Sequence, residues 1–129
     1  MKTQTGENLS EKPQMHMVGL NNSVFTNLAA TLTEVRKLKG VNGYILRNNT
    51  AAIVDLSEKE HTTDYAMLSS EIHESRRYLI KQYNLADIES MLLQGKNAKV
   101  LCLELGENRI AVFMDKACAH AWIVKRILL

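Results

Sequence analysis

The spacing of hydrophobic residues along this chain changes several times, and each change marks a new expected element. From Phe25 to Lys39, apolar residues recur every three or four positions, which predicts an amphipathic helix. Two short runs rich in β-branched and aromatic residues follow, at Asn42 to Arg47 and Ala51 to Leu56, and they predict a hairpin. Helical spacing returns from Thr63 to Tyr83, which predicts a long second helix.

The second half of the chain predicts three further strands between Glu89 and Asp115 and a final amphipathic helix from Ala117 to Leu129. The first of these strands, at residues 89–94, is ambiguous because the surrounding apolar residues also fit a helix. The order helix, two strands, helix, three strands, helix is typical of an α+β domain. We therefore expect a small antiparallel sheet covered by helices.

Polar residues and glycine mark the expected ends of these elements. Residues 21–23 offer N-caps for the first helix, and Gly40 offers a stop. The asparagines at 48–49 tolerate the positive φ of a tight hairpin turn, and the threonines at 62–63 are candidate caps for the second helix.

Length and composition indicate one domain. The chain has 129 residues, of which 46% are hydrophobic, so it can bury a core without disulfides or metal. Residues 1–20 begin with a polar stretch and are expected to form a mobile tail, which leaves residues 21–129 as the domain.

The charge pattern and the N-terminal sequence exclude several classes of function. The net charge is +2 and the basic residues are spread along the chain, so we expect no nucleic-acid binding. No signal peptide and no run of about 18 apolar residues is present, so we expect a cytoplasmic protein without a membrane span.

The reactive side chains form no recognisable catalytic or metal-binding motif. Cys102 and Cys118 lie in apolar surroundings and are expected to be buried free thiols. His73 has the wrong spacing from neighbouring acids for a metal site and is expected to be a partly exposed helix residue. Because phosphate-binding loops and nucleophile elbows are also absent from the sequence, we expect no enzyme activity, cofactor or metal.

The long helix at 63–83 carries two apolar stripes. The broader stripe predicts the surface that packs on the sheet and consists of Tyr65, Leu68, Ser69, Ile72, Leu79, Ile80 and Tyr83. The thinner stripe lies roughly opposite and consists of Met67, Glu71, Glu74 and Tyr78. Two interpretations stay open: a partner covers this second stripe, or its apolar residues are ordinary exposed ones.

Two arginines follow these stripes. Arg76 falls within the broader stripe, where it can extend past the edge of the core or pair with an acid at an interface. Arg77 lies beside the thinner stripe and can join a partner contact.

The organisation of the chain resembles the Roadblock/dynein light chain domain, in its prokaryotic branch. The resemblance is carried by Val41 to Leu46 with its valine–x–glycine start, by Ala51 to Val54, by Leu68 to Ile72, and by the stretch from Ser90 to Met114. Residues 48–50 are Asn-Asn-Thr where that family often has aspartate–glycine, a change that keeps a turn-competent pair.

The resemblance implies a five-stranded antiparallel sheet in profilin-like layers, with the long second helix on one face and the terminal helices on the other. It also implies that residues 89–94 form a strand. Domains of this family pair with themselves or with a paralogue through the second helix and the edge of the third strand. By position, and with Arg77 added, this surface would comprise Met67, Glu71, Glu74, Arg77, Tyr78, Met91 and Leu93.

Dimers of this family bind and regulate small Ras-like GTPases or act as scaffolds and adaptors. The resemblance therefore implies a non-enzymatic dimeric regulator of a small GTPase. A structural adaptor without effect on nucleotide turnover is a second hypothesis. A small-molecule sensor is a third, and it is less favoured because only 5% of the residues are aromatic.

Overall fold

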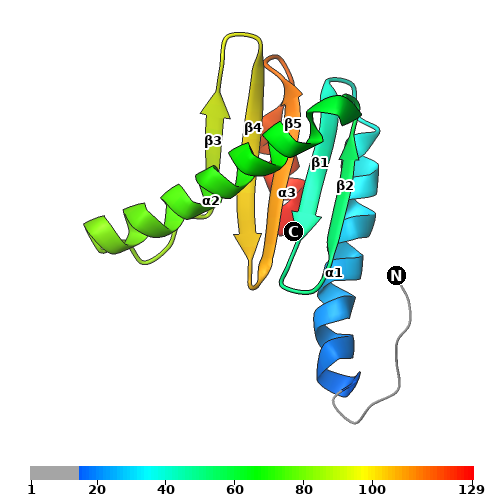
Figure 1. The fold of residues 1–129 in the computed structure, drawn as a ribbon, viewed down its shortest axis with the longest axis vertical. Coiled ribbons are helices and arrows are strands. Elements are labelled where there is room, and N and C mark those ends of the chain that lie inside the picture. The colour runs from blue at the N-terminus through cyan, green and yellow to red at the C-terminus, as the bar shows by residue number, and fades with distance from the viewer. Residues whose placement is uncertain (1–14) are drawn as a thin grey trace.

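One antiparallel sheet of five strands forms the centre of the structure (Figure 1). The structure is a computed structural model. It describes residues 15–129, with their side chains from residue 23 onward. The strand order across the sheet is β2-β1-β5-β4-β3. The elements, in chain order, are α1 (Met15–Arg36), β1 (Val41–Arg47), β2 (Ala52–Leu56), the 3-10 turn η2 (Lys59–His61), α2 (Thr62–Tyr83), β3 (Ser90–Gln94), β4 (Ala98–Leu105), β5 (Asn108–Asp115) and α3 (His120–Leu128).

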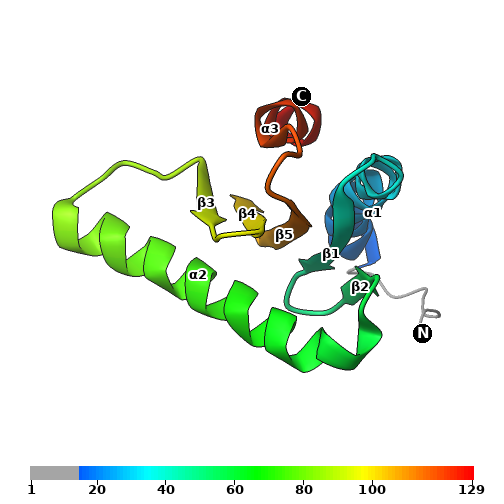
Figure 2. The ribbon, with the colours of Figure 1, turned by 90° about the horizontal axis from the view of Figure 1, so that it is seen from above.

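The helices cover the two faces of the sheet unequally. Figure 2 shows α2 alone on one face and both α1 and α3 on the other. This is the α+β arrangement with helices on both faces of a five-stranded sheet that the family resemblance implied, and it is confirmed. The strand expected at residues 89–94 is also confirmed, because β3 pairs antiparallel with β4 from Ser90 opposite Leu103 to Gln94 opposite Lys99.

The larger core lies between the sheet and the pair α1 and α3. The helical stripe predicted for the first helix is buried here through Leu28, Leu32 and Val35. In α3 the buried positions are Ile123 and Ile127, and partly buried Val124 and Leu128 pack beside them. The buried side chains on this face are Leu28, Leu32, Val35, Val41, Tyr44, Leu46, Leu101, Leu103, Ile110, Val112, Met114, Ile123 and Ile127.

A smaller core lies between the sheet and α2. Tyr65 of α2 stacks on Phe113 of β5, with ring centroids 4.8 Å apart and ring planes 29° apart. Partly buried Ala66, Leu68 and Met91 pack against this core. Its buried members are Ile45, Leu56, Ile72, Val100, Cys102, Ala111 and Phe113.

Gly43 lets the β1–β2 hairpin pack closely. A Cβ atom at this position would lie 2.5 Å from the carbonyl oxygen of Asp55 and 2.8 Å from Cα of Leu56. A side chain here would therefore collide with the backbone of β2, which cannot move without disturbing the ladder. This contact gives a physical reason for the glycine two residues after Val41.

The β1–β2 turn closes differently from the prediction. Positive φ was expected at residues 48–49, but the only non-glycine residue with positive φ within the described chain is Asn84. Instead, the side-chain oxygen of Asn48 accepts hydrogen bonds from the backbone N–H groups of Thr50 and Ala51, each at 2.9 Å. Side-chain bonding of this kind stabilises a turn without a left-handed residue.

The ends of the first helix also differ from the prediction. α1 begins at Met15, so the residues 21–23 expected to cap it lie inside the helix. Of the tail predicted at residues 1–20, residues 1–14 lie outside the described residues and residues 15–20 belong to α1. α1 ends at Arg36, and Gly40, with φ of 91°, redirects the chain into β1.

The threonine caps predicted for the second helix are wrong. His61 occupies the N-cap position of α2 without a side-chain cap. The hydroxyl of Thr62 instead donates to the carbonyl of Lys59, at 2.7 Å. At the other end, Asn84 adopts a left-handed conformation with φ of 54° and ends the helix.

Candidate functional site

The third strand forms one edge of the sheet. Within the described residues β3 pairs only with β4, so its outer backbone groups face away from the sheet. Leu93, at the edge, is 51% exposed. Unpaired N–H and C=O groups on an edge strand can pair with a strand from another chain.

The second stripe of α2 lies on the surface. Met67 is 57% exposed and Tyr78 is 62% exposed, and Glu71 and Glu74 between them are exposed as well. Arg77 is exposed beside this stripe and donates a hydrogen bond to Glu74 Oε1 at 3.3 Å.

Met91 lies in a different environment from the other predicted interface residues. It faces the α2 side of the sheet and packs, partly buried, against the smaller core. It therefore supports α2 from beneath, while Leu93 supplies the exposed apolar side chain of the edge.

The C-terminal half of α2 projects beyond β3, as Figures 1 and 2 both show. Tyr83 was predicted on the sheet-facing stripe, but it is 66% exposed because the sheet ends before it. The prediction for Tyr83 is therefore wrong. Leu85, just after the helix, is exposed too, so this projection carries apolar side chains with no sheet beneath them.

An apolar groove lies beside the start of α2. It has a volume of about 440 Å³ and is bounded by α2, by the end of β3, and by the adjoining ends of β4 and β5. Leu93 belongs both to the groove and to the strand edge, so the two features adjoin. The groove is lined by Asn42, Tyr65, Leu68, Leu93, Gln94, Gly95, Ala98, Lys99, Val100, Phe113 and Met114.

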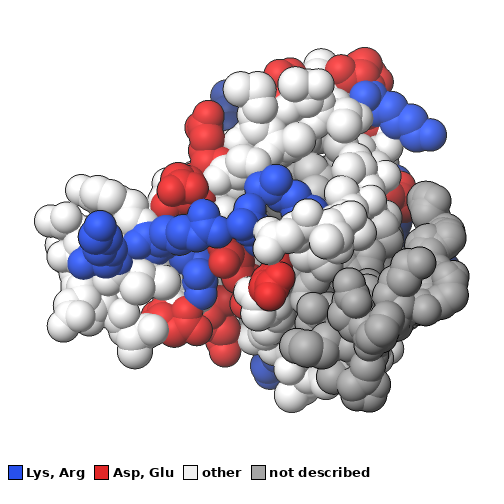
Figure 3. Space-filling model, turned by 60° about the horizontal axis from the view of Figure 1, so that its bottom comes forward, with Lys and Arg blue, Asp and Glu red and all other residues white. Residues whose placement is uncertain are grey.

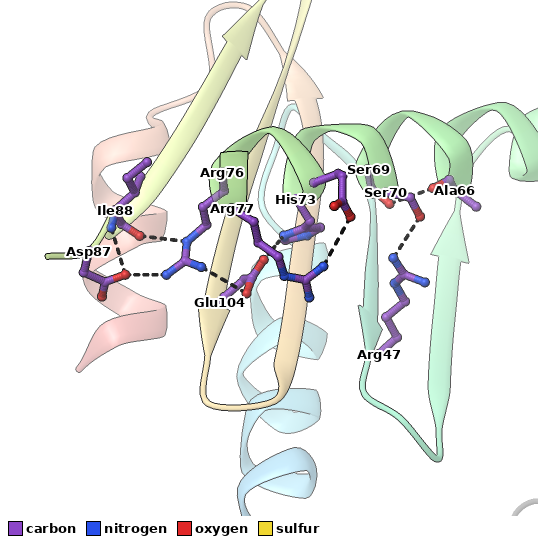
Figure 4. Close-up of polar contacts among 11 residues, drawn as sticks. Arg47, Ala66, Ser69, Ser70, His73, Arg76, Arg77, Asp87, Ile88 and Glu104 are labelled. Carbon is purple, nitrogen blue, oxygen red and sulfur yellow. Dashed lines mark hydrogen bonds and ion pairs between the residues drawn. The ribbon is translucent and has the colours of Figure 1, made fainter. Parts of the chain in front are cut away.

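A buried polar cluster lies beneath the middle of α2 (Figure 4). Glu104 of β4 accepts hydrogen bonds from Nδ1 of His73 at 2.9 Å and from Nη1 of Arg76 at 3.2 Å. Arg76 also donates to the carbonyl of Ile88 at 3.0 Å and pairs with Asp87. Arg76 therefore ties the segment that leads into β3 to the underside of α2, and its acid partners lie within the chain.

His73 was predicted to be partly exposed, and that prediction is wrong because its side chain is only 3% exposed. Burial lowers the pKa of His73, the carboxylate of Glu104 opposes this shift, and the nearby Arg47 and Arg109 reinforce it. Because a carboxylate oxygen accepts hydrogen bonds, Nδ1 of His73 carries the proton and donates a hydrogen bond to Glu104.

Sequence reasoning missed this cluster, although β4 contains one signal of it. Val100, Cys102 and Glu104 alternate toward the same side of the sheet, and the first two are apolar core residues. A carboxylate at an inward strand position requires a partner, and that requirement points to a cation on the covering helix.

The thiols have different environments. Burial, followed by the charge of Glu104, raises the pKa of Cys102 to about 12, so this thiol stays protonated and unreactive near neutral pH. Cys118 is only partly buried, which differs from the prediction that both thiols are buried.

The described residues contain neither a metal-binding cluster nor a membrane-spanning helix. Within residues 15–129, no group of three or more His, Cys, Asp or Glu side chains is arranged to hold a metal ion. No helix in the same range is both long and apolar enough to cross a membrane.

Comparison with known proteins identifies the fold. No family model matches the sequence, and no curated protein matches it either. Solved structures do match: MglB from Myxococcus xanthus aligns with a TM-score of 0.65 and 18% identity, over 81% of this chain and 88% of that one. A Roadblock/LC7 domain from Streptomyces avermitilis aligns with a TM-score of 0.59 and 12% identity, over 82% of this chain and 87% of that one.

This chain has the Roadblock fold. The gliding protein MglB from Thermus thermophilus also matches, with a TM-score of 0.55 and 15% identity over 81% of this chain and 82% of that one. The resemblance stated from the sequence is thus confirmed at the level of the fold. The roles of the predicted interface residues remain predictions.

Proposed function

We propose that this chain is a non-enzymatic regulator or scaffold of a small Ras-like GTPase and that it acts as a dimer in the cytoplasm. The observation that carries the proposal is the open edge of β3, which adjoins the apolar groove and lies beneath the projecting end of α2. The Roadblock fold supports it, because the family resemblance implies both pairing and a GTPase partner. No nucleic acid, cofactor or metal takes part in this proposal.

The proposed dimer is isologous, the commonest arrangement of a soluble homodimer. Two copies joined edge to edge at β3, about a two-fold axis normal to the sheet, would form one continuous sheet. The same rotation would bring the projecting end of each α2, with Tyr83 and Leu85, toward the apolar groove of its neighbour. Apolar side chains that are exposed in one copy would then be covered in the pair.

The thinner stripe of α2 faces outward, and we call it the outward stripe. It would supply contacts both between the two copies of the dimer and to the GTPase. Met67 and Tyr78 offer apolar area, while Glu71, Glu74 and Arg77 give the stripe its charge pattern. Such a surface acts by favouring one state of a bound GTPase over another, since a ligand shifts a two-state equilibrium only through its differential affinity.

The experiment measures GTP hydrolysis by a small Ras-like GTPase encoded beside the gene for this chain, with and without the protein. We expect the wild-type protein to change the turnover rate and the double variant Met67→Asp/Tyr78→Asp to lose this effect. Val54→Asp on β2 is the matched control, because Val54 is an exposed apolar residue at the opposite edge of the sheet.

The outcomes separate regulator from adaptor. Binding to the GTPase without any change in turnover would favour a structural adaptor. Absence of both binding and any change in turnover would contradict the proposal. Equal loss of effect in Val54→Asp would show that the outward stripe of α2 is not the contact surface.

A further inference from the structure

Three arginines from three separate elements lie on the side of α2 away from the apolar groove, and two of them line one hollow there. Arg47, at the end of β1, lies directly opposite Arg109 of β5 in the strand register. Arg77 of α2 lines the same hollow of about 180 Å³ as Arg109. Figure 4 shows Arg47 and Arg77 extending into the space beneath the helix. We call this feature the arginine groove.

The hollow is lined by two arginines, Arg77 and Arg109, and by two acids, Glu104 and Glu107. Glu104 lines the hollow, but both of its oxygens are already bonded, to Arg76 and to His73. Arg47 donates to the neutral hydroxyl of Ser70 at 2.8 Å. Within the described residues, Arg109 makes no side-chain hydrogen bond or ion pair.

Two acids lie at the rim of the groove. Glu74 accepts from Arg77 at 3.3 Å with its own side chain 75% exposed, and Glu107 lines the hollow beside Asn49. Exposed pairs of this kind contribute little to stability, so little is lost when Arg77 leaves Glu74 for another carboxylate. In Figure 3, basic side chains form a band across this face with acidic side chains on both sides of it.

The register itself indicates that the charge has a use. Like charges placed directly opposite each other on neighbouring strands destabilise a sheet. Arg47 and Arg109 form such a pair, and both also act on buried His73, whose pKa they help to lower. Glu104 lies opposite Arg109 on the other neighbouring strand and acts on His73 more strongly than either arginine, so it offsets part of this positive charge. An anion bound between Arg47 and Arg109 would offset the rest.

We propose that the arginine groove binds the carboxylates of an acidic segment of a partner protein. Guanidinium groups match carboxylates in geometry and form strong, charge-assisted hydrogen bonds. The hollow is smaller than the roughly 300–1,000 Å³ typical of small-molecule sites, so it suits one acidic side chain at a time. The inference goes beyond the proposed function, because one chain builds the whole groove and pairing is not required.

A fluorescent hexaglutamate peptide tests this proposal on the full chain, by anisotropy at low ionic strength. We expect saturable binding that weakens by about tenfold in Arg109→Gln and by a similar factor in Arg77→Gln, as the loss of one charged hydrogen bond predicts. Glu74→Gln should tighten binding, because it frees Arg77. Arg126→Gln, an exposed cation on α3, is the matched control and should change nothing.

Several results would overturn the proposal. The first is absence of peptide binding, and the second is an equal loss of affinity in Arg126→Gln. The third is displacement of the peptide by inorganic phosphate at the same concentration of anionic groups. Such displacement would indicate a site for small anions. Arg77 is exposed, so Arg77→Gln keeps the test valid even if Arg109→Gln fails to fold. Met67→Asp/Tyr78→Asp should bind the peptide normally, which separates this inference from the proposed dimer.

Discussion

The two faces of the sheet differ in how completely they are covered. On the α1 and α3 face, two helices close over a large core, and Leu32, Leu46, Ile110 and Met114 are fully buried. On the α2 face, one helix crosses the sheet and continues beyond it, so sheet surface stays open on both sides of the helix. We infer that one face stabilises the fold and the other carries the interactions.

The open face is itself divided by α2. On one side lies the apolar groove, which adjoins the free edge of β3, and on the other lies the arginine groove. These surfaces have different chemistry and suit different partners: a second copy of the chain for the first, and an acidic segment for the second.

The largest expected effect compares a leucine on each face. Leu103→Ala on the α1 and α3 face removes a buried side chain, so the free energy of unfolding should fall by about 3 kcal/mol. Leu93→Ala at the open edge should lower it by less than about 1 kcal/mol in the dissociated chain, because Leu93 is half exposed. Urea denaturation at low protein concentration measures both.

Equal losses for the two leucines would contradict the division between a stabilising face and an interacting face. The m-value should stay unchanged in both variants, which shows that each still unfolds in one cooperative step.

A smaller effect tests the buried cluster of the α2 face through pH. The folded state lowers the pKa of His73 below its ordinary value of 6.5, so the unfolded state takes up a proton first as the pH falls. The stability linked to His73 is therefore full above about pH 6.5 and declines as the pH falls toward the lowered pKa.

The melting temperature should fall less in His73→Gln than in the wild type when the pH is lowered from neutral to below the ordinary histidine pKa. His61→Gln serves as the control, since His61 is half exposed at the start of α2. A decline of unchanged size in His73→Gln would show that the buried imidazole does not control the pH dependence.

The smallest effect concerns the two thiols. In the native protein, a thiol-specific reagent should modify Cys118 well before Cys102, because burial keeps Cys102 protonated. Cys118→Ser should remove the faster phase of modification. Rapid reaction of Cys102 would mean that the α2 face opens far more readily than its packing indicates.

The sequence predicted the fold well because apolar spacing reports directly on burial. The stripe through Leu28, Leu32 and Val35 followed from local pattern. So did the order of the elements along the chain, except for β3, which the family resemblance assigned as a strand. Tyr83 was misplaced for a physical reason: helical spacing shows which residues share a stripe, but it does not show where the sheet beneath them ends.

The candidate site was harder to predict because its residues come together from distant parts of the chain. Arg47, Arg77 and Arg109 belong to three elements, so their meeting depends on strand register and on the crossing of α2. The outward stripe of Met67 and Tyr78 could be predicted, since both residues lie on one helix and its periodicity sets their direction.

The open α2 face and the β3 edge are the surfaces that we propose to pair with a second copy of this chain. Light scattering coupled to size exclusion, at tens of micromolar protein, tests this pairing most directly. We predict a mass twice the 14.6 kDa of one chain, shifted toward one chain by Met67→Asp/Tyr78→Asp but not by Val54→Asp. A wild-type mass of one chain throughout this concentration range would contradict the account.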